Sequence, residues 1–254
     1  MKRVLPALAL CCLAFAAHAR TLAEIKERGA IGLCAHPNSL PFASKTADPP
    51  GFQIELGRAL ARELGVSLTP DWILTAYQIS RADCDIMLDV IADPEAQEES
   101  RLKLSAPYYH SGVSLAVPQN SRIGSYASLD GTTKVGVQVG SIAAMTLDQR
   151  HVRISIFGFE EDMLDAIGAH EVDAAAVTAT SAGYYNKRHP GHEVVVLPPD
   201  ETAPALSWNV AVGMRRPDAT LKEAIDAALV RLTKDGTIAA IYARYGVTLQ
   251  PPKL

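Results

Sequence analysis

The 254-residue sequence lacks features that would point to a metalloprotein or to a membrane-spanning protein. It contains four cysteines, and only Cys34 and Cys84 lie beyond the first twenty residues. Two isolated cysteines do not form the ligand set of a metal site, so we expect neither a metal nor another cofactor. No second long apolar run follows the N-terminal one, so we expect no membrane span in the rest of the chain.

A basic surface and the familiar catalytic motifs are missing as well. The chain has 24 Lys and Arg residues against 28 Asp and Glu residues. This balance argues against nucleic-acid binding, which needs a basic footprint. The sequence contains no H-E-x-x-H motif, no phosphate-binding loop and no serine-hydrolase order of residues. These absences predict a binding protein rather than an enzyme.

The first nineteen residues have the pattern of an export signal. A basic start precedes the apolar stretch 4–17, and Ala17-His18-Ala19 has the A-x-A form of a signal peptidase site. The apolar stretch is shorter than the ~20 residues that span a bilayer. We predict a signal peptide over 1–19 and a periplasmic mature chain, with a retained N-terminal anchor as the alternative.

Export to an oxidising compartment favours a disulfide between the two remaining cysteines. Cys34 ends one apolar run and Cys84 begins another. If these runs are neighbouring parallel strands, their register could place the two Cα atoms beyond the ~7 Å limit of a disulfide. The residues therefore leave two alternatives, a Cys34–Cys84 disulfide or two buried thiols.

The mature chain shows one α/β pattern followed by a second. The first has a capped helix from Thr21 to Gly29 and an amphipathic helix that ends at Gly65. Its expected strands are 31–35, 66–72 and 85–90, and a short helix is expected to run through Tyr77. The second has expected strands over 135–139, 152–157, 172–177 and 193–197, with helices from Ser141, over 160–168 and over 181–188.

This repetition predicts an α/β fold of two lobes joined by two crossing strands. We expect the first lobe to comprise 20–116 and 208–254, and the second lobe to comprise 117–207. The predicted hinge residues are Val117, Gln119, Trp208 and Asn209. The space between two hinged lobes is a natural ligand cleft.

The ordered series of motifs resembles the family 3 extracellular solute-binding proteins. The stretches that carry it are TLAEIKERGAIGLC, GFQIELGRALARELGV, CDIMLDV, SAPYYHSGVSLAVP, VGVQVGS and LVRLTKDGTIAAIYARYGV. The resemblance covers nearly all of the mature chain. It implies a type II periplasmic binding protein fold that closes over a small polar solute, and an ABC permease as partner.

A narrower likeness is to the MoxJ/XoxJ subgroup, which is associated with PQQ-dependent (quinoprotein) methanol dehydrogenases. It is carried by CAHPNSLPF, RLKLSAPYY, VDAAAVTATSAGYY and SWNVAVGMRRPDATL. The paired cysteines of the first lobe belong to this likeness. It implies an accessory role in alcohol oxidation, by contact with a periplasmic quinoprotein dehydrogenase.

Several expected cleft positions depart from the pattern of amino-acid receptors. Asp89 stands where the family has a small hydroxyl residue, and its charge would repel a substrate carboxylate. Thr178 replaces the aspartate that receives the ammonium group, and Ser39 replaces a stacking aromatic residue. These differences argue against an ordinary α-amino acid as the ligand.

Five further residues are candidate ligand contacts. Arg101 would fork onto an anionic group or neutralise Asp89, or else it is a surface arginine in a charged loop. Gly140 and Ser141 begin a helix whose free N–H groups can receive an anion, although Ser141 is equally suited to a plain N-cap. His36 follows the first strand together with Asn38, either as ligand contacts or as exposed loop residues.

Two tyrosines and a tryptophan near the expected hinge have structural interpretations. Tyr108 and Tyr109 are expected to pack the turn, with bonded hydroxyls, rather than to stack on a ligand. Trp208 suits both the core and the cleft wall.

Three functions remain open at this point. The first is a solute receptor, and the second is an accessory protein of a quinoprotein dehydrogenase. The third is a dehydratase-like enzyme on the same fold, in which Asp89 and His36 would form an acid–base pair.

Overall fold

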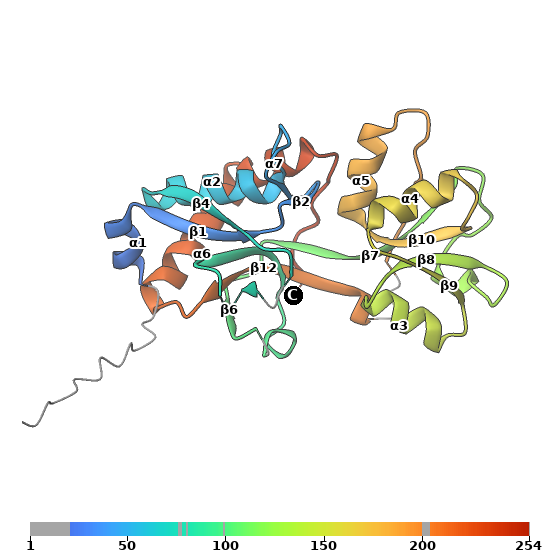
Figure 1. Ribbon diagram of the computed structural model, residues 1–254, viewed down its shortest axis with the longest axis horizontal. Helices are drawn as coiled ribbons and strands as arrows, with labels where there is room; N and C mark the ends of the chain where they lie inside the picture. The colour runs from blue at the N-terminus through green and yellow to red at the C-terminus, as the bar shows by residue number, and fades with distance from the viewer. Residues whose placement is uncertain (1–20, 76–77, 80, 99, 200–203, 254) are drawn as a thin grey trace, which may run out of the picture.

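The computed structural model describes residues 21–75, 78–79, 81–98, 100–199 and 204–253. The predicted signal peptide and part of the short helix predicted through Tyr77 lie outside these ranges. The described chain forms two α/β lobes side by side, and strands β7 (Tyr109–Val117) and β12 (Ser207–Arg215) run between them (Figure 1).

The first lobe is built on parallel strands, as predicted. β1 (Ala30–Ala35) lies between β4 (Ser67–Trp72) and β5 (Ile86–Ile91) and pairs in parallel with both. β12 then pairs antiparallel with β5 and with β6 (Leu102–Leu104).

Helices of the first lobe cover one face of this sheet. They are α2 (Phe52–Leu64), α6 (Ala219–Lys234) and α7 (Thr237–Ala243). Alternate residues of β1, namely Ile31, Leu33 and Ala35, belong to the apolar core that these helices share. This alternation follows from the two-residue period of a strand.

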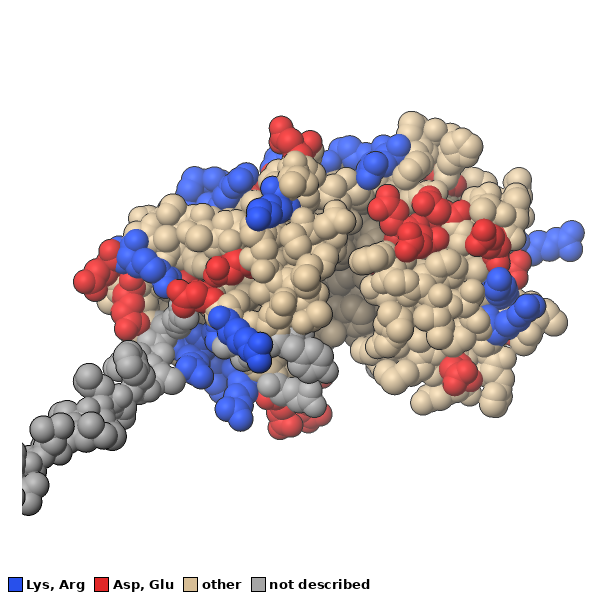
Figure 2. Space-filling view, in the orientation of Figure 1, with Lys and Arg blue, Asp and Glu red and all other residues tan. Residues whose placement is uncertain are grey.

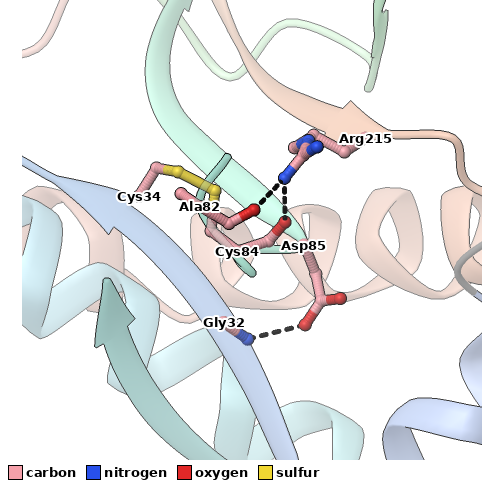
Figure 3. The surroundings of a disulfide bond; sticks show 6 residues. All are labelled: Gly32, Cys34, Ala82, Cys84, Asp85 and Arg215. Carbon is pink, nitrogen blue, oxygen red and sulfur yellow. Dashed lines mark hydrogen bonds between the residues drawn. A yellow bond between two sulfur atoms is a disulfide. The ribbon is translucent and has the colours of Figure 1, made fainter. Parts of the chain in front are cut away.

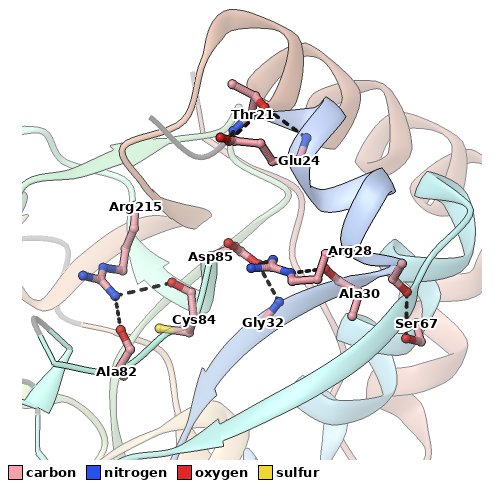
Figure 4. A network of polar contacts seen from close by, with 11 residues as sticks. Thr21, Glu24, Arg28, Ala30, Gly32, Ser67, Ala82, Cys84, Asp85 and Arg215 are labelled. Atoms are coloured by element: carbon pink, nitrogen blue, oxygen red, sulfur yellow. Dashed lines mark hydrogen bonds and ion pairs between the residues drawn. The ribbon is translucent and has the colours of Figure 1, made fainter. Parts of the chain in front are cut away.

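Local capping signals set the ends of the first helices. α1 (Leu22–Arg28) begins at a capping box in which Thr21 and Glu24 exchange hydrogen bonds (Figure 4). It ends at Gly29, which has φ of 71°, and α2 ends at Gly65, which has φ of 74°. These three predicted ends are confirmed.

The second lobe has helices on both faces of its sheet. The strands follow the order β7, β10 (Ala174–Thr178), β8 (Lys134–Gln138) and β9 (Arg153–Phe157), and β11 (Val195–Leu197) pairs with β7. α3 (Ile142–Gln149) packs in one apolar cluster, while α4 (Glu160–Gly168) and α5 (Ala179–Arg188) pack in another. α4 has the predicted bounds.

Short elements complete the two lobes. They are the β2 (Asn38–Ser39) and β3 (Ala43–Ser44) pair and the 3₁₀ turns η2 (Glu95–Gln97), η3 (Tyr126–Ser128) and η4 (Pro204–Leu206). One hydrogen-bonded ladder continues from β4 through β12 and β7 to β9. The buried apolar residues nevertheless fall into separate clusters in the two lobes, so each lobe has its own core.

The lobes meet where β7 and β12 pair, at 109–112 and 207–210. The His110 ring contacts the Ser207 hydroxyl at 2.8 Å and the Asn209 side chain at 3.0 Å. Of the predicted hinge residues, Trp208 and Asn209 lie in this segment. Val117 lies farther along β7, where it pairs with Val195 of β11, and the Gln119 amide donates to the Glu193 carbonyl. The hinge residues and lobe boundaries stay predictions.

A further contact joins the lobes at α5. A Cβ atom at Gly183 would lie 2.5 Å from the Gly246 carbonyl oxygen, so this approach depends on the missing side chain. The Lys187 ammonium donates to the Arg244 carbonyl at 2.5 Å. Tyr184 of α5 packs against the core of the first lobe. Helix α5 therefore adheres to the segment that follows α7.

The disulfide is present and joins Cys34 to Cys84 with a Cα–Cα distance of 5.2 Å (Figure 3). The chain before β5 passes very close to β1 at Gly32, where a Cβ atom would lie 2.9 Å from the Cys84 Cα atom. This close passage brings the two cysteines within the range of a disulfide.

Polar contacts hold the same passage in place. The buried Asp85 carboxylate accepts a hydrogen bond from the Gly32 N–H at 2.7 Å and pairs with Arg28 (Figure 4). Arg215 donates to the carbonyls of Ala82 and Cys84 (Figures 3 and 4).

Candidate functional site: the cleft between the lobes

A cleft of about 680 Å³ lies between the lobes and receives residues from both. Its first-lobe wall includes His36, Asn38, Ser39, Phe42, Gln53, Ile73, Leu74, Met87, Leu88 and Asp89. Its second-lobe wall includes Gln138, Phe159, Glu160, Glu161, Asp162, Thr178, Ser181, Tyr184, Tyr185 and Arg188. Figure 2 shows the hollow between the lobes, with acidic side chains of the second lobe beside it.

Asp89 occupies an irregular point of β5. Between two regular pairs, Leu88 and Asp89 oppose the single residue Val212 of β12. Asp89 has φ of 56°, in the left-handed region that few residues other than glycine adopt. A bulge of this kind redirects a side chain out of the strand's regular alternation. Backbone strain of this sort is often found at functional positions.

The redirected carboxylate meets a group of buried hydroxyls. Asp89 Oδ1 accepts hydrogen bonds from Tyr109 at 2.7 Å, from Tyr242 at 2.8 Å and from Tyr108 at 3.2 Å. Tyr242 comes from α7, near the end of the chain. Burial, reinforced by the charge of Asp89, raises the pKa of each tyrosine well above its usual value, so the hydroxyls remain donors. The expected packing role of Tyr108 and Tyr109 is confirmed.

The second oxygen of Asp89 has a different environment. Asp89 as a residue is partly exposed, but its Oδ2 atom is buried and has no hydrogen-bond partner among the described residues. Burial raises the pKa of Asp89, and the tyrosine hydroxyls and the nearby Gln53 amide partly oppose that rise. One oxygen of this carboxylate thus has three donors, and the other has none among the described residues.

Acidic residues begin α4 on the opposite wall. Glu160 accepts hydrogen bonds from the Thr178 N–H at 2.9 Å and from its hydroxyl at 2.8 Å. Glu161 lies 3.7 Å from Arg188, and the Arg188 guanidinium lies over the Tyr184 ring. The described lining residues therefore include four carboxylates and one arginine, Arg188, which already contacts Glu161 and Tyr184.

The structure brings together five of the predicted contact residues in the cleft lining: His36, Asn38, Ser39, Asp89 and Thr178. Arg101, Gly140 and Ser141 are not among the residues that line it. Arg101 is exposed, in the segment between η2 and β6. Ser141 accepts a hydrogen bond from the Ala144 N–H at 3.1 Å, which is the plain N-cap arrangement.

The remaining candidates have ordinary partners. His36 Nδ1 accepts from the Asn38 N–H at 3.1 Å, whereas Asp89 bonds to tyrosines. The suggested pairing of His36 with Asp89 as acid and base is therefore not among the observed contacts. Trp208 is partly buried and packs against the cores of both lobes.

Sequence reasoning missed much of the second-lobe wall. The sequence shows an acidic first turn of α4 at Glu160, Glu161 and Asp162. Acidic residues are common at helix N-termini because they interact favourably with the helix dipole, so they gave no specific sign of a cleft. Tyr242 lies at a buried position of α7, and nothing in the sequence indicates that its hydroxyl contacts Asp89. Gln53 had no signal, because it is one polar residue on an amphipathic helix.

Neither a metal-ligand cluster nor a membrane-spanning helix is present among the described residues. Those residues contain no group of three or more His, Cys, Asp or Glu side chains placed to hold a metal ion. In the same part of the chain, no helix has the length and apolar character needed to cross a membrane.

These features define a two-lobe binding protein with an inter-lobe ligand cleft. Residues 31–248 match the bacterial extracellular solute-binding proteins, family 3, and the chain belongs to that family. The L-cystine-binding protein TcyJ of Escherichia coli (strain K12) is 26% identical over 236 residues, which cover 88% of this chain and 85% of TcyJ.

Solved structures support the type II fold. The Ancestral Cationic Amino Acid Solute Binding Protein (AncCDT-1) has a TM-score of 0.75 and 24% identity, over 89% of this chain and 99% of that one. MxaJ from Methlophaga aminisulfidivorans MPT has a TM-score of 0.69 and 19% identity, over 86% of this chain and 99% of that one.

Proposed function

We propose that this protein is a non-catalytic periplasmic receptor that closes its lobes over a small polar solute and delivers it to an ABC permease. The observation that carries the proposal is the cleft of about 680 Å³, lined from both lobes and spanned by paired strands at one end. Closure of such lobes would surround a solute with groups from both walls, which gives affinity and selectivity together.

The charges of the cleft narrow the kind of solute. The relative TcyJ is an L-cystine-binding protein by its name. In this chain a substrate carboxylate would meet Asp89, and Arg188 is already paired with Glu161. We therefore propose a small polar solute other than an ordinary α-amino acid.

A metabolite panel tests the receptor function. Calorimetry and thermal shift should identify a solute that binds and raises Tm, because a ligand that binds only the native state stabilises it. Small-angle scattering with that solute should show a smaller radius of gyration as the lobes close. A broad panel with no binder and no thermal shift would count against the receptor function.

A second function, contact with a quinoprotein dehydrogenase, is favoured by the altered anion site. Asp89 stands in place of the small hydroxyl residue of amino-acid receptors. Thr178, whose hydroxyl donates to Glu160, stands in place of their ammonium-binding aspartate. The fold of MxaJ, matched at a TM-score of 0.69, is compatible with this role. This second function predicts that the protein co-purifies with a periplasmic alcohol dehydrogenase or stimulates its activity. If the protein neither binds nor stimulates the dehydrogenase under activating conditions, this second function is excluded.

A further inference from the structure

We propose that the cleft binds a primary aliphatic amine without a free carboxylate, and that Asp89 Oδ2 receives its ammonium group. This inference rests on the proposed solute-binding function and names its ligand class. The receptor could still bind another solute if the inference is wrong, and the experiment below separates the two outcomes.

Asp89 Oδ2 lacks a hydrogen-bond donor among the described residues. A carboxylate oxygen accepts hydrogen bonds, and leaving one buried without a donor is unfavourable. Asp89 Oδ1 is saturated by Tyr108, Tyr109 and Tyr242, whereas Oδ2 has no partner in the described chain. An arriving N–H group would complete the carboxylate.

The hydrogen-bond partners described for Asp89 supply no positive charge. The described contacts of Asp89 are neutral hydroxyls and an amide, and no arginine or lysine is among them. A buried carboxylate with neutral partners is stabilised most by a cation. An ammonium group supplies both the positive charge and the donor, and a hydroxyl supplies the donor alone.

The neighbours of Asp89 fix the position of its carboxylate. The hydroxyls come from β7, from its preceding residue and from α7, and the bulge holds the backbone of Asp89. Tyr108 and Tyr109 rings lie 5.1 Å apart, and Tyr109 and Tyr242 rings lie 5.3 Å apart. The carboxylate is thus held in one orientation before a ligand arrives, which lowers the entropic cost of binding.

Gln53 lies near Asp89 in the cleft wall. Its side chain is partly exposed in the cleft wall, and its amide donates to the Leu88 carbonyl at 3.5 Å, the longest distance that still counts as a hydrogen bond. Such a weak bond allows the amide to turn aside when an ammonium group approaches. The ligand therefore exchanges a weak internal contact for a charge-assisted one.

The rest of the cleft suits an amine with an apolar body. The first-lobe wall of the cleft includes Phe42, Ile73, Met87 and Leu88 in addition to Asp89. The second wall has Phe159 together with Glu160 and Asp162. A hydrocarbon chain could lie along the apolar residues, while the acidic wall repels any carboxylate on the same molecule.

The test uses probes that share one carbon skeleton. Calorimetry with the full mature protein should detect butylamine and 1,4-diaminobutane, and it should show 1-butanol and butyrate as much weaker ligands. A charge-assisted hydrogen bond is worth about 10- to 100-fold in affinity, which sets the expected gap. Binding of the alcohol or of butyrate as tight as that of the amine would overturn the inference and leave the receptor function standing.

Variants locate the ammonium. Asp89→Asn should weaken amine binding about 10- to 100-fold. Glu171→Gln removes the same charge from an exposed position outside the cleft lining and should leave affinity unchanged. Equal losses in both variants would show a general charge effect and overturn the assignment. If no probe of the amine, alcohol or acid class binds, and a wider metabolite panel also fails, the receptor function fails with the inference.

Discussion

The two lobes use different means to cover their sheets. In the second lobe, α3 covers one face, and α4 and α5 cover the other, each with its own apolar cluster. In the first lobe, α2, α6 and α7 share a large core on one face. The other face carries a small cluster of Cys34, Cys84, Ile73 and Ile79, with Met87 against it.

This difference indicates that the disulfide stabilises the face of the first lobe that has only a small apolar cluster, whereas packed helices stabilise both faces of the second lobe. A cross-link restricts the unfolded chain instead of burying more apolar surface. Cys34 lines the cleft together with Ala35 and Leu88, which belong to the helix-covered core, so residues of both sheet faces reach the cleft.

The lobes also differ in how they present negative charge. Asp89 of the first lobe is held by buried tyrosines, whereas Glu161 and Asp162 of the second lobe are exposed at the start of a helix. Changes at the first site should therefore affect folding stability, and changes at the second should barely do so.

Removing the disulfide should have the largest effect on stability. The bond closes a loop of sequence separation 50, for which the chain-entropy relation gives about 4 kcal/mol. We expect a Cys34→Ser, Cys84→Ser double variant to lose about that free energy of unfolding in urea. A reductant should lower the wild-type midpoint towards that of the variant and leave the variant itself unchanged. Equal stability of the reduced and oxidised wild type would contradict the stabilising role of the bond.

The contact between α5 and the first lobe should come next. Gly183→Ala places a methyl group 2.5 Å from the Gly246 carbonyl oxygen, and overpacking of this kind costs about 1–3 kcal/mol. Urea unfolding should show that loss, and scattering should show the lobes farther apart. Gly168→Ala, at the end of α4 with no atom within 4 Å, is the matched control and should be neutral or slightly stabilising. Similar behaviour of both variants would mean that α5 does not depend on this contact.

Asp89→Asn should be more stable than the wild type at neutral pH. The folded-state pKa of Asp89 is raised by burial, so ionisation destabilises the fold as the pH rises above the unfolded value of 3.8 and through that raised pKa. Asparagine avoids this cost and also tolerates the positive φ. Thermal unfolding should show a gain at neutral pH that disappears below the unfolded pKa. A constant difference at all pH values would contradict the burial explanation.

Amine binding should favour the ionised form of Asp89, whereas folding favours its protonated form. An ammonium ligand needs ionised Asp89, so affinity for butylamine should rise with pH through the raised pKa of Asp89. Calorimetry in buffers of different ionisation enthalpy should detect proton release from Asp89 in that window. Asp89→Asn should lose this pH dependence. An unchanged profile in the variant would place the titrating group elsewhere.

The smallest effect should come from Glu161→Gln. Glu161 and Arg188 are both exposed and 3.7 Å apart, and such pairs contribute little to stability. We expect the free energy of unfolding to change by less than about 1 kcal/mol, with the difference falling as salt is added. A loss comparable to that of the disulfide variant would overturn the contrast between the two lobes.

The framework of both lobes could be predicted from the sequence. The caps at Thr21, Gly29 and Gly65 depend on residues within one helical turn, and the strands alternate with helices in parallel style. Strand ends set by distant partners were less accurate. The strand expected over 193–197 begins only at Val195, where its pairing with Val117 of β7 starts.

The site was only partly predictable. Asp89, His36 and Thr178 were chosen because they follow strands or match family positions, and they do line the cleft. Arg101 was chosen for its charge and Ser141 for its helix start, and neither feature specifies which way a loop turns. Glu160 reaches Thr178 because α4 and α5 pack side by side, which no local pattern reports.

The sequence by itself determined the elements, the two-lobe plan and the chemistry available to the cysteines, since capping, periodicity and oxidation act over a few residues or through composition. Tertiary structure alone decided what surrounds Asp89. Its hydroxyl partner Tyr242 lies 153 residues away, and the bulge that turns its carboxylate depends on pairing with β12. A buried charge takes its properties from neighbours in space, and these are known only once the chain has folded.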